Sequence, residues 1–321
     1  MRFPTRFIVL SCLVVMLPLA GCSVKNVPWT ETNAKTIHSL KVVSWIPQAT
    51  VAPAIYPSHA GAAGIPFGAI GAIIAVTVEA SIDSSRDKKA EEKIKPLAEI
   101  GRSLNVPGEF LEGLKRASQD FSRIAFQELV TQPKGSLEEA RKAALSGLSE
   151  DAALLIATDY YLSPDFKVFS MRSQAEIWDK TGKTLLYKGE WDYHSPPKEG
   201  EEEAQRISAW TAENGAPYFA AVRDAIEKTD MMLRLALTEV AADTESETTS
   251  ISYAGPGKSE TMTVEGPILK RLSGSTILKD KNGNLHAFPS PAPQTVTDGS
   301  PAPAPGHASE HSEPSATPGP Q

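Results

Sequence analysis

The chain has 321 residues, and its 32 Lys and Arg against 39 Asp and Glu give a net charge of −7. This acidic balance argues against a general nucleic-acid-binding or anionic-lipid-binding surface. Cys12 and Cys22 are the only cysteines, which excludes a disulfide-rich framework and a cysteine-rich zinc site.

The first 22 residues carry the most specific pattern of the chain. Arg2 and Arg6 precede an apolar run over residues 7–19, and the run leads into Leu19-Ala20-Gly21-Cys22. A positive end, a short apolar run and small residues are typical of an export signal. The run is shorter than the roughly 20 apolar residues that a membrane-spanning helix needs.

Leu19-Ala20-Gly21-Cys22 resembles the lipobox of bacterial lipoproteins. The resemblance implies that residues 1–21 are a signal peptide, which is removed, and that Cys22 becomes the first residue of the mature chain. Its sulfur then takes a diacylglyceryl group and its amine takes a third acyl chain such as palmitate. Ser23, in place of an aspartate, implies sorting to the outer membrane of a Gram-negative bacterium. The alternative is an ordinary cleaved signal with a chance cysteine.

Loss of Arg2 and Arg6 with the signal leaves 30 basic and 39 acidic residues, a net charge of −9. Residues 22–35 are predicted to be a lipidated tether. Residues 36–46 predict a first strand.

A segment without charge follows at residues 61–78. Its glycines share one side of a helix, and each costs a helix about 1 kcal/mol relative to alanine. Close approach of another backbone would offset that cost. Three interpretations stay open: a glycine zipper that touches the membrane or another subunit, a buried element, or a Gly/Ala loop. The candidate packing residues are Gly61, Gly64, Gly68 and Gly71.

Three helices are predicted next, over residues 83–95, 107–131 and 137–148. Ser136 and Glu139 have the spacing of a capping box before the third. The second rests on apolar residues at helical spacing. These are Phe110, Leu114, Ala117, Phe121, Ile124 and Leu129.

The pattern then changes to that of strands. Residues 152–162 are largely apolar, and residues 166–178 and 184–194 alternate around a tight turn at residues 179–182. Two helices follow over residues 201–213 and 217–241. Residues 36–241 are thus predicted to be one α+β domain, an antiparallel meander sheet with amphipathic helices on one face.

The C-terminal part is predicted to be less ordered. Residues 242–288 are interpreted as a weakly structured linker with an Asn282-Gly283 turn. Residues 289–321 are rich in proline and alanine and are predicted to be a disordered tail. The tail is either plain solvated chain or an arm that binds a partner.

Asp159, Glu190 and Asp192 lie on the predicted meander with His194. Paired carboxylates serve acid–base chemistry when they share a cleft, but the simpler interpretation is the solvent face of a sheet. The meander is also rich in aromatic residues, which indicate core packing or, for an exposed subset, a protein or glycan contact surface. These are Tyr160, Tyr161, Trp178, Tyr187, Trp191 and Tyr193.

The remaining motifs give only weak signals for a catalytic, phosphate-binding or metal-binding site. Gly255-Pro256-Gly257-Lys258-Ser259 lacks the first glycine of a phosphate loop, since Ser252 occupies that position. No Gly-x-Ser-x-Gly nucleophile motif is present. His307 and His311 offer at most a weak metal contact. No catalytic residue, cofactor or resident metal is therefore expected.

Residues 152–162 with Asp179-Lys180-Thr181-Gly182-Lys183 and the flanking strands resemble uncharacterised bacterial outer-membrane lipoproteins. Their α/β module is similar to that of the curli-secretion lipoprotein and of lipoprotein activators of peptidoglycan synthases. The resemblance covers roughly residues 36–240 and implies no site residue.

The combined expectation is a non-enzymatic lipoprotein, anchored in the outer membrane through Cys22 and facing the periplasm. Its role is structural, in assembly or in protein binding, with an envelope protein or a second copy as partner and no nucleic acid. One alternative is a hydrolase or transferase that acts on envelope polymers. The other is an oligomeric membrane-assembly component that uses residues 61–78.

Overall fold

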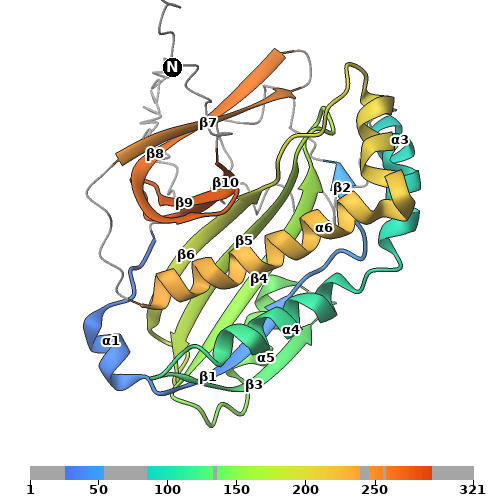
Figure 1. The fold of residues 1–321 in the computed structure, drawn as a ribbon. Coiled ribbons are helices and arrows are strands. Elements are labelled where there is room, and N and C mark those ends of the chain that lie inside the picture. The colour runs from blue at the N-terminus through green and yellow to red at the C-terminus, as the bar shows by residue number, and fades with distance from the viewer. Residues whose placement is uncertain (1–25, 54–84, 133–135, 239–245, 256–257, 291–321) are drawn as a thin grey trace, which may run out of the picture. The chain divides into compact units, whose positions relative to one another are not determined.

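The structure is a computed structural model that describes residues 26–53, 85–132, 136–238, 246–255 and 258–290. The described strands are β1 (Ser39–Trp45), β2 (Ala52–Pro53), β3 (Ala125–Gln132), β4 (Ala152–Leu162), β5 (Phe169–Asp179), β6 (Leu185–His194), β7 (Ser246–Gly255), β8 (Lys258–Leu272), β9 (Ser275–Lys279) and β10 (Leu285–Pro289). They form one sheet in the order β3-β1-β4-β5-β6-β10-β9-β8-β7, and β2 pairs with β4 (Figure 1).

The meander predicted from alternation is confirmed as β4, β5 and β6. β5 pairs with β4 from Ala152↔Asp179 to Leu162↔Phe169, and β6 pairs with β5 in the antiparallel direction. In the turn between β5 and β6, the Asp179 carboxylate accepts the backbone N–H groups of Lys183 and Thr184 at 3.0 Å. Gly182 has a φ of +69°, which a glycine adopts without strain.

The sheet as a whole is mixed and not purely antiparallel. β1 runs parallel to both β3 and β4, and β10 runs parallel to β6. The α+β class is correct, but the antiparallel description holds only for part of the sheet. A parallel pair needs a long crossover, so its partners lie far apart in the sequence and leave no local signal.

The single helix predicted for residues 107–131 is wrong in its second half. Helix α4 (Val106–Ser118) ends, and the chain turns back into β3. The helical spacing of apolar residues continues past the end of α4 only by coincidence, at Phe121, Ile124 and Leu129. The pairing of β3 with β1, eighty residues or more earlier in the chain, decides the local structure.

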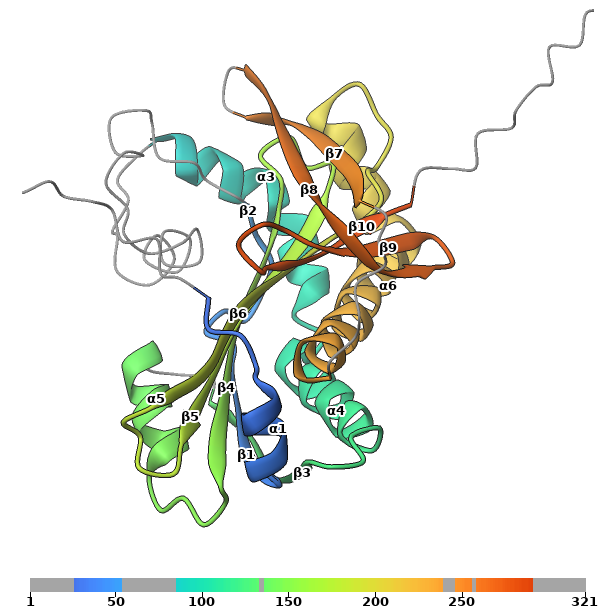
Figure 2. The same cartoon turned by 90° about the vertical axis from the view of Figure 1, so that its left-hand side faces the viewer.

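Helices cover both faces of the sheet, and not one face as predicted (Figure 2). The face that carries Leu154 and Ile156, called the helix face below, packs against α4, α3 (Ser85–Gly101) and α6 (Glu203–Leu237). Helix α5 (Leu137–Leu145) packs on the opposite face, which carries Leu155. β4 is buried at every position, so each of its faces requires a covering layer.

The capping box of α5 is confirmed. The Glu139 N–H donates to Ser136 Oγ at 3.2 Å, and the Ser136 N–H donates to Glu139 Oε2 at 2.6 Å. α6 contains the two helices predicted for residues 201–213 and 217–241, separated by a break at Ala212–Gly215. Glu213, Asn214 and Gly215 have φ values of +49°, +56° and +86°. A Cβ at Gly215 would lie 2.4 Å from Ile100 Cγ2, so this position requires glycine.

The linker predicted for residues 242–288 is wrong where the structure describes it. β7 and β8 form a long hairpin, and β9 and β10 continue the main sheet through the pairing of β10 with β6. Leu285, Ala287 and Phe288 are buried. Residues 246–290 therefore belong to the same compact unit as the meander, although the ten residues of β7 include only one branched aliphatic residue, Ile251. Pro289 and Ser290, predicted to begin the tail, end β10 and follow it.

The tether predicted for residues 22–35 is docked on the sheet from Asn26 onward. Val27 and Lys188 exchange both backbone hydrogen bonds, at 3.0 and 2.9 Å. Asn33 Nδ2 donates to the Leu186 carbonyl at 3.0 Å, and α1 (Glu31–Thr36) leads into β1. The N-terminal segment thus covers the part of the β6 edge that β10 leaves open.

Several predictions fall on residues outside the described ranges. They concern Cys22, the segment 61–78 with Gly61, Gly64, Gly68 and Gly71, and the tail from residue 291. None of the described helices is long and apolar enough to span a membrane.

Candidate functional site

Charged and polar side chains line the sheet face opposite the helix face. Strand alternation puts every second residue of β5 and β6 there, and the register sets them in opposite pairs. The pairs are Ser170↔His194, Arg172↔Asp192, Gln174↔Glu190 and Glu176↔Lys188. These eight side chains are called the polar ladder below.

Arg172 and Asp192 form the central ion pair of the ladder. Arg172 Nε lies 2.5 Å from Asp192 Oδ1, and the two side chains are 12% and 8% exposed. Burial alone would raise the pKa of Asp192, but the charge of Arg172, with smaller contributions from His286 and His194, holds it below its usual value. Asp192 therefore stays ionised at neutral pH.

Asp159 lies on the other side of Arg172, directly opposite it in the β4–β5 register. Its side chain is buried, and neither carboxylate oxygen has a hydrogen-bond partner. Burial raises the pKa of Asp159 to about 7, against the attraction of Arg172 and with help from the charges of Asp192 and Glu190. This carboxyl is therefore only partly ionised at neutral pH.

His194 and Ser170 form the neutral end of the ladder. Ser170 Oγ and His194 Nδ1 are hydrogen-bonded at 2.9 Å, and His194 Nε2 is buried without a partner. Burial lowers the pKa of His194 to about 4, so the ring is neutral at pH 7. Phe288 of β10 stacks on it, with ring centroids 5.1 Å apart. A serine–histidine pair is present, but no described carboxylate orients the far nitrogen of His194.

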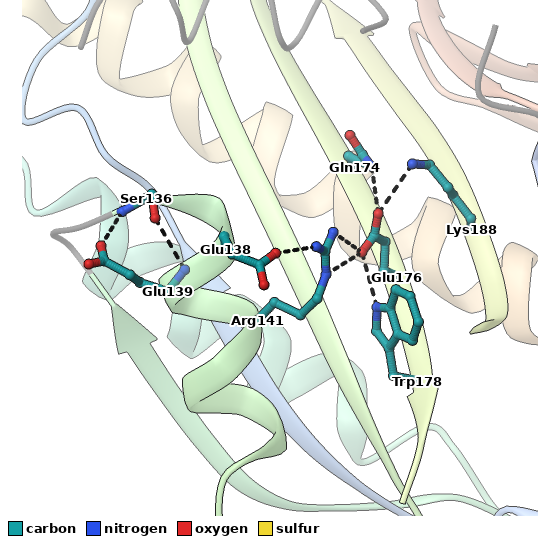
Figure 3. Close-up of polar contacts among 8 residues, drawn as sticks. All are labelled: Ser136, Glu138, Glu139, Arg141, Gln174, Glu176, Trp178 and Lys188. Carbon is teal, nitrogen blue, oxygen red and sulfur yellow. Dashed lines mark hydrogen bonds and ion pairs between the residues drawn. The ribbon is translucent and has the colours of Figure 1, made fainter. Parts of the chain in front are cut away.

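Glu176 anchors the opposite end of the ladder to α5 (Figure 3). Arg141 Nη2 donates to its carboxylate at 2.9 Å, Trp178 Nε1 at 3.0 Å and Gln174 Nε2 at 2.9 Å. Lys188 Nζ adds an ion pair at 3.2 Å. Burial opposes ionisation, but these partners together keep the pKa of Glu176 below its usual value.

His286 extends the cluster across β10, which sequence reasoning missed. Its Nδ1 lies 3.5 Å from Asp192 Oδ2, and its Nε2 lies 3.3 Å from Asp280 Oδ2. Hydrogen bonds from His286 and Asn284 outweigh burial and lower the pKa of Asp280 to about 2. Ninety-four residues separate His286 from Asp192, and only the parallel pairing of β10 with β6 brings them together.

The solvent-face interpretation of these carboxylates is wrong. Asp159, Asp192 and His194 are 1%, 6% and 3% exposed. The structure does bring them together on one face with Glu190. A signal was available in β4, because a strand that is largely apolar on both of its faces is covered on both sides. Its neighbour β5 then buries its polar side too.

The aromatic side chains of the meander belong to the core. Trp178 is half-buried beneath Arg141, whose guanidinium carbon lies 5.3 Å from the ring centroid. The other five are buried. The core-packing interpretation holds, and the described structure offers no exposed aromatic surface on these strands.

Metal and phosphate sites find no support in the described ranges. There, no group of three His, Cys, Asp or Glu side chains is arranged to hold a metal ion. Lys258 begins strand β8, which pairs back onto β7, so no helix follows the glycines to form a phosphate loop. His59, His307 and His311 lie outside the described residues.

Comparison with known proteins identifies no family for this chain. No family model matches it, and no curated protein matches it. Among solved structures, protein XCC0632 from Xanthomonas campestris, described with the family model DUF330, aligns with 65% of this chain and 89% of its own, at 10% identity and a TM-score of 0.25. The hypothetical protein CT253 from Chlamydia trachomatis aligns with 60% of this chain and 96% of its own, at 11% identity and a TM-score of 0.24. Similarity at this level supports no conclusion about function.

Proposed function

We propose that this chain is an outer-membrane lipoprotein, anchored through Cys22 and facing the periplasm, with a non-enzymatic role in binding or assembling envelope proteins. The anchor rests on Leu19-Ala20-Gly21-Cys22. The non-enzymatic role rests on the polar ladder, whose charged groups, apart from the half-buried Glu190, are largely buried and paired with one another. A side chain that is buried and paired in this way is poorly placed to meet a substrate, and loss of its partner would leave an uncompensated buried charge.

The paired state of Arg172 and Asp192 carries this proposal. Arg172 is the arginine of the ladder itself, and its contact with Asp192 at 2.5 Å leaves its Nε committed to that carboxylate. The contacts of Glu176 likewise join α5 to the sheet. A rigid, internally satisfied sheet is suited to presenting an outer surface to a partner.

The anchor is tested by replacing its sulfur. The Cys22→Ser variant, expressed with its signal in a Gram-negative host, is expected to leave the membrane fraction. Mass spectrometry of the mature N-terminal peptide of the wild type is expected to find three acyl chains. Cys12→Ser is the matched control, because it changes the only other thiol and should stay anchored. Membrane association of Cys22→Ser equal to that of wild type contradicts the anchor.

The partner is tested by crosslinking in intact cells, followed by identification of the captured proteins. A specific envelope protein or a second copy of the chain is expected, and it should be lost when the anchor is removed by Cys22→Ser. A chain that remains uncrosslinked across several reagents, and monomeric after detergent extraction, contradicts a binding role.

A hydrolase or transferase that acts on envelope polymers is the second candidate. Asp159 favours it, because a buried carboxyl with a pKa near 7 is typical of a general acid. Incubation of the purified protein with isolated peptidoglycan tests it. Released fragments that disappear with Asp159→Asn, and persist with the exposed-site control Glu99→Gln, would replace the binding role with an enzymatic one.

A further inference from the structure

The described structure begins at Asn26, four residues after the proposed acylated cysteine. Asn26 Nδ2 donates to Asn284 Oδ1 at 2.7 Å and to the Asn282 carbonyl at 2.9 Å. Val27 is then held by two backbone hydrogen bonds to Lys188. The chain is therefore fixed to the β9–β10 turn and to β6 from its first described residue.

This position limits the distance between the fold and the lipid. An extended chain covers at most about 3.6 Å per residue, so the four steps from Cys22 to Asn26 span roughly 14 Å. The headgroup layer of one leaflet takes about 5–7 Å of that reach. The β9–β10 turn is thus confined close to the headgroups, whatever the conformation of the intervening residues.

The β9–β10 turn beside this point carries two lysines although the chain is acidic. A Cβ at Gly283 would lie 3.8 Å from Lys279 Cε and 3.6 Å from Asn26 Nδ2, which places Lys279 beside the N-terminal segment. Lys279 and Lys281 are exposed.

The carboxylate within the turn itself, residues 279–284, is already paired. Asp280 contacts His286 and accepts hydrogen bonds from Asn282 and Asn284. With Lys279 and Lys281 on either side of it, the turn carries a net charge of +1.

We propose that the β9–β10 turn faces the membrane and that Lys279 and Lys281 contact the phosphates of anionic lipid headgroups. This inference rests on the proposed acylation of Cys22. The short chain ahead of Asn26 would then fix the orientation of the sheet on the bilayer, and it would not simply tether a freely tumbling domain. A lysine held at an anionic surface strengthens binding roughly fivefold.

Headgroup quenching on the acylated full chain tests this orientation. The mature protein has no free thiol once Cys22 is acylated, so an introduced cysteine is the only labelling site. Asn282→Cys reports on the turn, and Gln127→Cys is the matched control. Gln127 is exposed on β3, five strand steps and about 24 Å from β10.

In vesicles of phosphatidylethanolamine and phosphatidylglycerol that carry a headgroup quencher, a fluorophore at residue 282 is expected to be quenched several-fold more than one at residue 127. Twelve Gly/Ser residues inserted after Lys25 are expected to abolish the difference. The pair Lys279→Glu and Lys281→Glu is expected to reduce it in anionic vesicles but not in vesicles of phosphatidylcholine.

Equal quenching at residues 127 and 282 in protein whose acyl chains are confirmed by mass would overturn the orientation and leave the anchor standing. A mature N-terminus without acyl chains would overturn both. A difference that survives the insertion would also count against the inference, because it would show that the short connection does not set the orientation.

Discussion

Two carboxyl groups on either side of Arg172 have pKa values shifted in opposite directions. Asp192 receives the Nε–H of Arg172 and stays ionised, whereas Asp159 is buried without a hydrogen bond and its pKa rises to about 7. Their common neighbour Arg172 alone does not explain this difference in pKa. At Asp192 the charge of Arg172 is helped by His286, by His194 and by the hydrogen bond, and together they outweigh burial. At Asp159 the charges of Asp192 and Glu190 add to the effect of burial.

We expect Asp159→Asn to change how stability depends on pH. The pKa of Asp159 is near 3.8 when unfolded and about 7 when folded, so between these values the folded state holds a proton that the unfolded state releases. Its contribution to stability therefore falls as pH rises from about 4 to 7 and is lowest above 7. The amide of the Asp159→Asn variant does not ionise and lacks this penalty. The gain in unfolding free energy over wild type should be roughly 2 kcal/mol larger at pH 8 than at pH 5.

Urea unfolding at both pH values measures this difference. Glu99→Gln, at an exposed position, is the control and should show no such trend. A gain from Asp159→Asn that is equal at pH 5 and pH 8 would contradict a raised pKa at this carboxyl.

At the scale of single elements, a buried carboxylate links α5 to the sheet beside the apolar contacts of this helix. The Glu176 carboxylate forms ion pairs with Arg141 of α5 and with Lys188 of β6 (Figure 3). We expect Glu176→Ala to lower the unfolding free energy by about 3 kcal/mol, because it leaves a buried cation unpaired. Glu138→Ala removes the exposed partner of the same Arg141 and should cost less than about 1 kcal/mol. Similar losses from the two variants, measured by chemical denaturation, would contradict the role given to Glu176.

At the left-handed break in α6, we expect substitutions at Glu213 and Gly215 to change the unfolding free energy in opposite directions. Glu213 is exposed and has a φ of +49°, so Glu213→Gly should raise the unfolding free energy by about 0.5–1 kcal/mol. Gly215→Ala should lower it by about 2 kcal/mol or more, because the new methyl meets Ile100 in a left-handed backbone. Thermal unfolding would measure both variants. A change in unfolding free energy in the same direction for both would contradict this geometry.

At the scale of the whole molecule, the C-terminal strands complete the fold. A chain that stops after Ser290 keeps the compact unit Met1–Ser290, and its melting temperature should lie within about 2 °C of wild type. A chain that stops after Thr238 loses β10, whose Leu285 and Ala287 are buried in the core, and should not fold cooperatively. Circular dichroism on heating would distinguish them, and a cooperative transition in the shorter chain would restore the linker interpretation.

The features predicted well from sequence are those with a local cause. Alternation in β5, the turn at Asp179 and the capping box at Ser136 depend on residues within a few positions of one another. β3 and the cluster around His286 depend on partners from about eighty to ninety-four residues away. The polar ladder was visible as a pattern, but its burial was not, because alternation alone does not say which face of a sheet meets water.

The pairing of β10 with β6 also makes folding wait for the C-terminal strands. The core cannot close until β10 has been synthesised, because Leu285 and Ala287 complete it. A chain that emerges from its N-terminus onward would therefore keep part of the β6 edge open until β10 arrives, and an unpaired sheet edge is a template for pairing with another chain.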